Sequence, residues 1–154
     1  MPLLDLALSV AHVLAGAAWF GAMVYSATVL HPRATVFFRK DEEFEAFIVT
    51  LSDGARWKVL GASILIAGSG IGLAIIRWRS PVPSAWLALF GLKVALFLGA
   101  VALFGYTSWW LWPRRVFATA EDLPALRRTF RLIAWMLLVL VGFNMALGVA
   151  AHLL

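Results

Sequence analysis

The sequence contains no cysteine and little charge. The absence of cysteine from all 154 residues excludes disulfide bonds, thiolate metal ligands and cysteine nucleophiles. Only 14% of the residues are charged, against about a quarter in a typical soluble domain. The apolar runs contain no carboxylate pair, and the chain has no H-E-x-x-H motif and no nucleophile elbow. Any enzymatic chemistry would therefore have to come from a cofactor.

Apolar residues are what the sequence has in excess. They make up 63% of the chain, and the mean hydropathy is +0.91. Four apolar runs stand out, each long enough at about 1.5 Å per residue to cross a hydrocarbon core of about 30 Å. The runs cover residues 3–30, 57–76, 86–112 and 132–154. The sequence therefore predicts an all-α integral membrane four-helix bundle, a single domain over residues 1–154 that sits in the lipid bilayer.

Lysine and arginine cluster on alternate connections between these runs. Ten of the 13 flank the first and third connections, residues 31–56 and 113–131, whereas only Arg77 and Arg79 flank the second. The positive-inside tendency predicts that the first and third connections are cytoplasmic and that both termini lie outside. We expect a bacterial-type inner (plasma) membrane protein with several spans. Because the basic residues lie beside apolar spans, no nucleic-acid partner is expected.

The first connection also carries an amphipathic pattern. Five apolar residues fall near one helical face, and charged residues fill most of the remainder. The five are Phe37, Phe44, Phe47, Ile48 and Leu51. This pattern is typical of a helix that lies at the membrane surface, so we expect such a helix between spans 1 and 2.

Small residues recur at intervals of four within the spans. Such spacing lets neighbouring helix backbones approach closely. The residues concerned are Ala17 with Gly21, Gly68 with Gly72, and Gly91 with Ala95 and Gly99. We expect close helix contacts at these positions, and we expect no internal repeat.

A few polar side chains interrupt the apolar runs. His12 and Lys93 each lie about 10 Å inside the outer end of their span, by the rise of a helix. Met145 and His152 of the last span are expected to share an outward-facing pocket with them. His12 is either a ligand or an interhelical hydrogen-bonding group. Lys93 either faces the bundle interior or extends to the headgroups, and the sequence leaves both alternatives open.

These side chains suit a transition metal or a haem. Histidine with methionine or a second histidine can ligate haem iron, and histidine with methionine also suits cuprous copper. With haem, His12 would be one axial ligand, Met145 or His152 the second, and Arg77 and Arg79 would pair with the propionates. The alternative is a cofactor-free structural or partner-binding membrane subunit, whose partner would be a second copy of the chain or another membrane protein.

The order of these features resembles a known family. The stretch AHVLAGAAWFGAMVY is followed by HPRA, then by a glycine-rich second span and a third span that opens FGLKVALFLGAVAL. This order resembles the CopD-like copper-resistance membrane domain and its relative, the four-helix HemJ-type protoporphyrinogen oxidase. The resemblance implies a four-helix membrane bundle with His12, Trp19 and Lys93 as functional, cofactor-binding positions.

The two branches of this resemblance imply different functions. The HemJ-like branch implies bound haem b and a haem-dependent oxidoreductase that oxidises a porphyrinogen. The CopD-like branch implies copper handling or uptake. The chain covers only the four-helix part of the longer copper-resistance proteins and lacks methionine-rich or histidine-rich stretches, which weakens the case for copper transport as an independent activity.

Overall fold

The computed structural model describes residues 2–151, and over this range the chain is helical and forms no strand. Nine helical elements follow one another along the described chain. They are α1 (Pro2–Tyr25), the π-helix η1 (Ser26–Leu30), α2 (His31–Phe37), α3 (Asp41–Ser52), α4 (Ala55–Arg77), α5 (Ser84–Gly105), the π-helix η2 (Tyr106–Leu111), α6 (Trp112–Val116) and α7 (Leu123–Ala151). The predicted all-α class is confirmed.

Four stretches of helix in the described chain are long and apolar enough to cross a membrane. They are Leu3–Phe37, Asp41–Arg77, Ser84–Val116 and Leu123–Ala151. The predicted number of four spans is thus confirmed. The fold is that of a protein that passes several times through a lipid bilayer.

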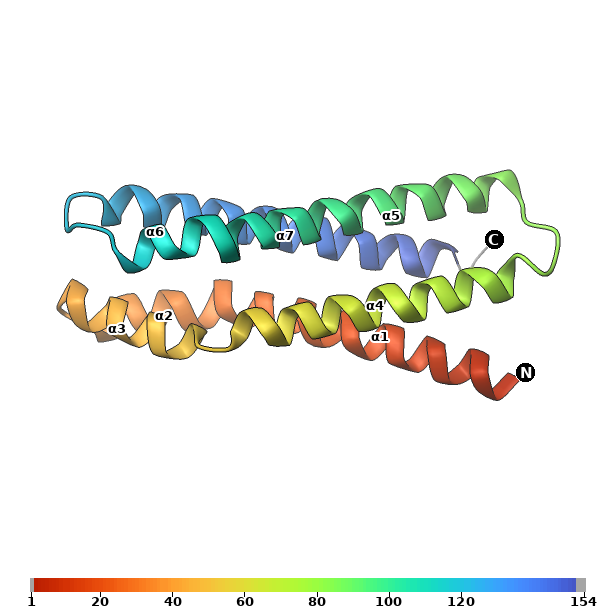
Figure 1. The fold of residues 1–154 in the computed structure, drawn as a ribbon, viewed down its shortest axis with the longest axis horizontal. Coiled ribbons are helices and arrows are strands. Elements are labelled where there is room, and N and C mark those ends of the chain that lie inside the picture. The colour runs from red at the N-terminus through yellow and green to blue at the C-terminus, as the bar shows by residue number, and fades with distance from the viewer. Residues whose placement is uncertain (1, 152–154) are drawn as a thin grey trace.

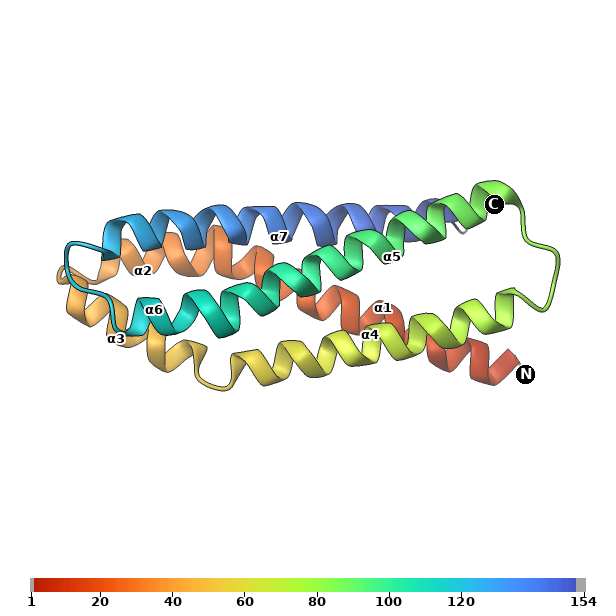
Figure 2. The ribbon, with the colours of Figure 1, turned by 45° about the horizontal axis from the view of Figure 1, so that its top comes forward.

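The helices form two antiparallel hairpins (Figure 1). In one hairpin α1 packs along α4, in the other α5 packs along α7, and contacts between α1 and α7 join the two. The start of α1, the end of α7 and the 78–83 connection lie at one end of the bundle, here called the terminal end (Figures 1 and 2). The segments 38–40 and 117–122 lie at the other, here called the basic end.

The helices extend further toward the basic end than the apolar runs do. The first does not stop at Leu30 but continues through η1 and α2 to Phe37, and the last begins at Leu123 instead of Leu132. The predicted ends were wrong because they followed hydropathy alone. The added turns of α7 contain three arginines, and Arg127 among them binds α3, so tertiary contacts extend the helix beyond its apolar run.

Each π-helix stands directly before a proline-containing turn. The N–H of His31 bonds to the carbonyl of Ser26, and that of Trp112 bonds to the carbonyl of Thr107, five residues back in each case. The following proline has no N–H and crowds the carbonyl four residues earlier, which the wider π turn accommodates. The local sequences also match, as YSATVLHPR (25–33) and YTSWWLWPR (106–114). The two hairpins therefore contain a short repeat, and the expectation of no internal repeat was wrong.

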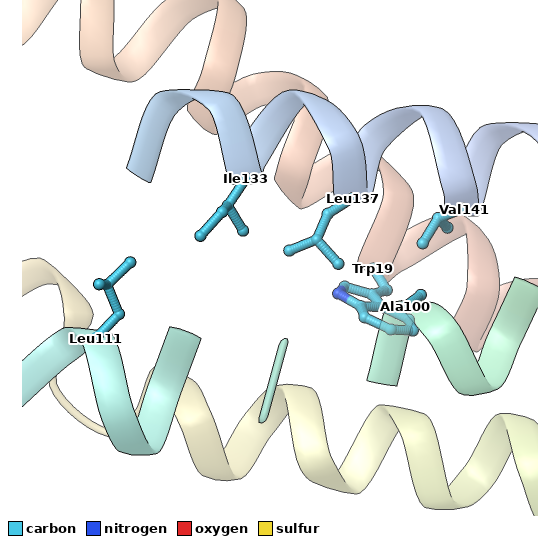
Figure 3. Packing of buried hydrophobic residues seen from close by; sticks show 6 residues of the cluster. All are labelled: Trp19, Ala100, Leu111, Ile133, Leu137 and Val141. Atoms are coloured by element: carbon cyan, nitrogen blue, oxygen red, sulfur yellow. The ribbon is translucent and has the colours of Figure 1, made fainter. Parts of the chain in front are cut away.

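The main core lies between the two hairpins. Trp19 of α1 packs with Ala100 of α5 and with a stripe of α7 residues spaced by four (Figure 3). The stripe consists of Ile133, Leu137 and Val141, and Leu111 of η2 belongs to the same cluster. Trp19 is only 6% exposed, so it is a central packing residue of the bundle.

Residues 41–52 of the predicted amphipathic segment form α3, whereas Phe37 ends α2 and does not share the face of α3. Its Phe44 and Ile48 are buried against Ala34 of α2, with Phe38 and Phe47 at the edge of this cluster. Part of the apolar face is thus covered by protein, because the short link 38–40 folds α3 back beside α2 (Figure 1). A position of α3 at the membrane surface stays a prediction.

The prediction of close helix contacts is confirmed at one glycine and is wrong at the other four. A Cβ added at Gly72 would meet Leu8 Cδ1 at 2.9 Å. At the remaining predicted glycines, Gly21, Gly68, Gly91 and Gly99, a Cβ would have no neighbour within 4 Å. Spacing alone did not identify the contact face, because helix rotation decides which glycines face a neighbour.

Candidate functional site

His12 joins α1 to α4 through its Nδ1 atom. This nitrogen lies 3.0 Å from the carbonyl oxygen of Ile66 and 3.0 Å from Ser69 Oγ. A carbonyl only accepts, and the Ser69 hydroxyl donates its own hydrogen to the carbonyl of Leu65 at 2.5 Å. Both partners therefore act as acceptors, and Nδ1 is the nitrogen that carries the hydrogen. In the neutral ring the lone pair is then on Nε2, which is the atom available to a ligand.

The backbone of α4 also fixes the position of the imidazole. A Cβ added at Gly70 would lie 3.1 Å from His12 Cε1 and 3.5 Å from Nδ1. The ring thus lies directly against the helix at this glycine, beside the buried Ser69. Glycine at this position lets the ring come close enough for its hydrogen bonds.

We expect Gly70→Ala to displace the imidazole and to lower the free energy of unfolding by about 1 kcal/mol, the lower range for overpacking a close contact. The matched control is Gly68→Ala, because a Cβ there meets nothing within 4 Å. Denaturant titration of the detergent-solubilised protein measures both variants. Equal stabilities of the two variants would show that the ring is not confined by α4.

Lys93 lies along the contact between α5 and α7. Its Nζ is 2.8 Å from the position of a Cβ at Gly148, and its backbone carbonyl accepts a hydrogen bond of 2.8 Å from Asn144 Nδ2. Gly148 is one helical turn, about 6 Å, beyond Asn144 toward the terminal end. The side chain is therefore half-buried against a neighbouring helix and also extends toward that end.

Helix rise places His12 and Lys93 in one layer of the terminal half of the bundle, where the His12 ring lies against Gly70 of α4 and Lys93 Nζ lies against Gly148 of α7. The layer thus combines a nitrogen lone pair with an ammonium, a combination that suits a ligand carrying both a metal and a negatively charged group.

The other predicted site residues lie in different settings. Trp19 is in the core, about 10 Å along α1 from His12 by helix rise. Met145 is half-buried on α7, next to Asn144. The Arg77 guanidinium lies 5.9 Å from the centre of the Trp86 ring.

Two of the predicted site residues remain to be placed. Arg79 lies in the connection after α4, and His152 lies outside the described residues. Within residues 2–151 no three His, Asp or Glu side chains gather as a metal site. The ligand roles of His12, Met145 and His152 stay predictions.

A cavity of about 670 Å³ opens at the basic end. It extends between the two hairpins, and η1, η2, α3 and α7 all contribute to its wall. His12, Lys93 and Met145 do not line it. This cavity is thus at the opposite end of the bundle from the pocket that the sequence predicts.

A buried ionic cluster stands beside this cavity. Arg115 Nε and Arg127 Nε each lie 2.8 Å from a carboxylate oxygen of Glu45, and Arg127 Nη1 lies 2.9 Å from Asp41. The Arg115 side chain is 5% exposed and that of Glu45 16%. The sequence predicts surface charges and topology signals at these positions, because nothing in their spacing shows that α3 meets α6 and α7.

No protein-family model matches the chain, and neither the curated proteins nor the solved structures contain a match.

Proposed function

We propose that the chain binds haem b or copper through His12 Nε2 in the terminal half of the bundle, and that it acts in membrane redox chemistry or copper handling. The observation that supports this proposal is the hydrogen bond from His12 Nδ1 to the carbonyl of Ile66. A histidine that ligates a metal usually donates its other ring N–H to a carbonyl or carboxylate, which sets the tautomer and the ring orientation.

Other residues of the chain would complete such a site. Met145 and His152 are the candidates for a second ligand, and Lys93 offers an ammonium to a carboxylate. Arg77 lies eight residues beyond Ser69 on α4, about 12 Å toward the terminal end. An arginine at that distance suits the propionates of a haem.

The two candidate cofactors differ in the chemistry that they supply. Bound haem would supply the one-electron chemistry of a porphyrinogen oxidation, whereas copper would make the chain a copper-handling protein. His12 serves as a ligand in either case. Both functions follow from the CopD-like and HemJ-like resemblance.

The proposal includes an orientation. The basic end, with the connections 31–56 and 113–131, faces the cytoplasm of a bacterial-type cell, and the terminal end faces outward. In that orientation α3 lies at the cytoplasmic membrane surface, and the His12 layer is in the outer half of the bilayer.

The second candidate is a cofactor-free structural or partner-binding subunit. The same hydrogen bond favours it, because a histidine that ties two membrane helices together needs no ligand. Its partner would be a second copy of the chain or another membrane protein.

We expect His12→Asn to fold normally and to lose its haem or copper. The amide nitrogen of asparagine takes the place of Nδ1 and donates to the carbonyl of Ile66, but asparagine has no nitrogen equivalent to Nε2. The matched control is His31→Asn, at the other end of the same long helix. Metal and haem content per chain, measured on purified protein, compares the two variants.

Each outcome of this comparison separates the two candidates. Loss of the cofactor in His12→Asn, with the cofactor retained in His31→Asn, supports the ligand role of His12. A folded His12→Asn protein with the cofactor content of the wild type would overturn it and leave the structural subunit as the function.

A further inference from the structure

The cavity at the basic end combines an apolar wall with an excess of positive charge. Its apolar part includes Val59, Phe104 and Leu137. Its charged part contains four arginines, namely Arg56, Arg115, Arg127 and Arg131. Glu45 and Asp41 pair with two of these arginines, so four positive charges minus two negative ones leave two positive charges.

Several donors of these arginines are without a partner in the described part of the chain. Arg56 and Arg131 make no hydrogen bond or ion pair with any of residues 2–151. Arg127 Nη2 is buried and also has no hydrogen-bond partner in that range. A buried donor without an acceptor costs about 1–3 kcal/mol. An anion in the cavity would remove this cost.

The wall of the cavity is also shaped by both π-helices. Ser26 and Ala27 of η1 and Thr107 and Ser108 of η2 line it, one pair from each hairpin. A π turn widens a helix locally, and such turns occur often at functional sites. The short repeat of the two hairpins thus places its two irregular segments around the same space.

We propose that this cavity binds an anionic phospholipid, with the headgroup phosphate at Arg56, Arg127 and Arg131 and an acyl chain along the apolar wall. A free anion would bind the arginines and leave the apolar wall without an occupant. A lipid uses both, and it is available because the chain spans a bilayer. Basic pockets between membrane helices are a known form of lipid headgroup site. This inference does not depend on the cofactor proposed above.

The proposal predicts selective binding of phosphatidylglycerol. Native mass spectrometry of the detergent-purified full chain counts bound lipid during titration with phosphatidylglycerol, phosphatidylcholine or inorganic phosphate. We expect saturable binding of phosphatidylglycerol only. In the double variant Arg56→Gln/Arg131→Gln the affinity should fall about 30-fold, since each basic residue contributes roughly fivefold to binding of an anionic membrane surface.

The matched control is Arg33→Gln/Arg114→Gln. These two arginines are exposed, occupy equivalent places in the repeat and do not line the cavity. The control removes the same charge and should keep the affinity of the wild type. Three results would each overturn the proposal: equal losses in the two double variants, equal binding of phosphatidylcholine, or competition by inorganic phosphate at the same concentration as the lipid.

Discussion

Replacing Glu45 with Gln is expected to lower the free energy of unfolding by about 3–5 kcal/mol, the usual cost of breaking a buried ion pair from one side. Glu45 is the shared partner of Arg115 and Arg127. The Arg115 guanidinium is almost fully buried, so the substitution leaves an uncompensated charge between α3 and α6. An SDS titration in mixed micelles, followed by circular dichroism, measures the loss.

The control for this prediction is Glu43→Gln on the same helix. Glu43 lies 3.8 Å from Lys40, and both side chains are more than half exposed. An exposed pair of this kind contributes about 0–1 kcal/mol. A Glu45→Gln protein no less stable than the control would mean that the Glu45 cluster does not hold α3 against α6 and α7.

Trp19→Ala is expected to cost about 3 kcal/mol, at the lower end of the range for removing a large aromatic side chain from a core. Trp19 is the α1 member of the cluster that joins the two hairpins, where it packs against Ala100, Leu137 and Val141 (Figure 3). In lipid the apolar transfer term is small, but the lost packing contacts still weaken helix association.

The matched control is Trp110→Ala, because Trp110 is 65% exposed. Its removal should change the free energy of unfolding by less than about 1 kcal/mol, as for most exposed substitutions. SDS titration with circular dichroism again compares the two variants. If both variants were equally stable, the interface between the hairpins would not depend on Trp19.

The number of spans could be predicted from the sequence, but the ends of the helices could not. An apolar run is a local property, since a segment in lipid must be predominantly apolar whatever the rest of the chain contains. Where a helix ends at the basic end depends on contacts between distant segments. Arg127 extends α7 beyond its apolar part by binding Glu45, and no local pattern encodes that pairing.

For the candidate site, the sequence predicts the depth of the polar residues but not their partners. Helix rise places His12 and Lys93 at one depth because depth depends only on position in the span. The partners of His12 could not be found in this way, because one of them is the backbone carbonyl of Ile66, and a carbonyl belongs to every residue. Ser69 gave a weak signal as a hydroxyl inside a span, and Gly70 gave none that separates it from Gly68.

The cavity at the basic end also escaped prediction. Its arginines come from α4, α6 and α7, and only the fold brings these segments together. A signal did exist in the shared order of Tyr, a hydroxyl residue, Leu, Pro and Arg in the first and third spans. This repeat marks the two π-helices, and aligning the two hairpins around the prolines would have found it.

The proposed cofactor is tested most directly by the visible spectrum of the detergent-purified protein from cells supplied with haem and copper. The spectrum is recorded oxidised and dithionite-reduced, and iron and copper are determined on the same sample. The account predicts one equivalent of haem with a sharp reduced-state band, or one equivalent of copper, and loss of either in His12→Asn. A colourless wild-type protein that contains neither metal would contradict it.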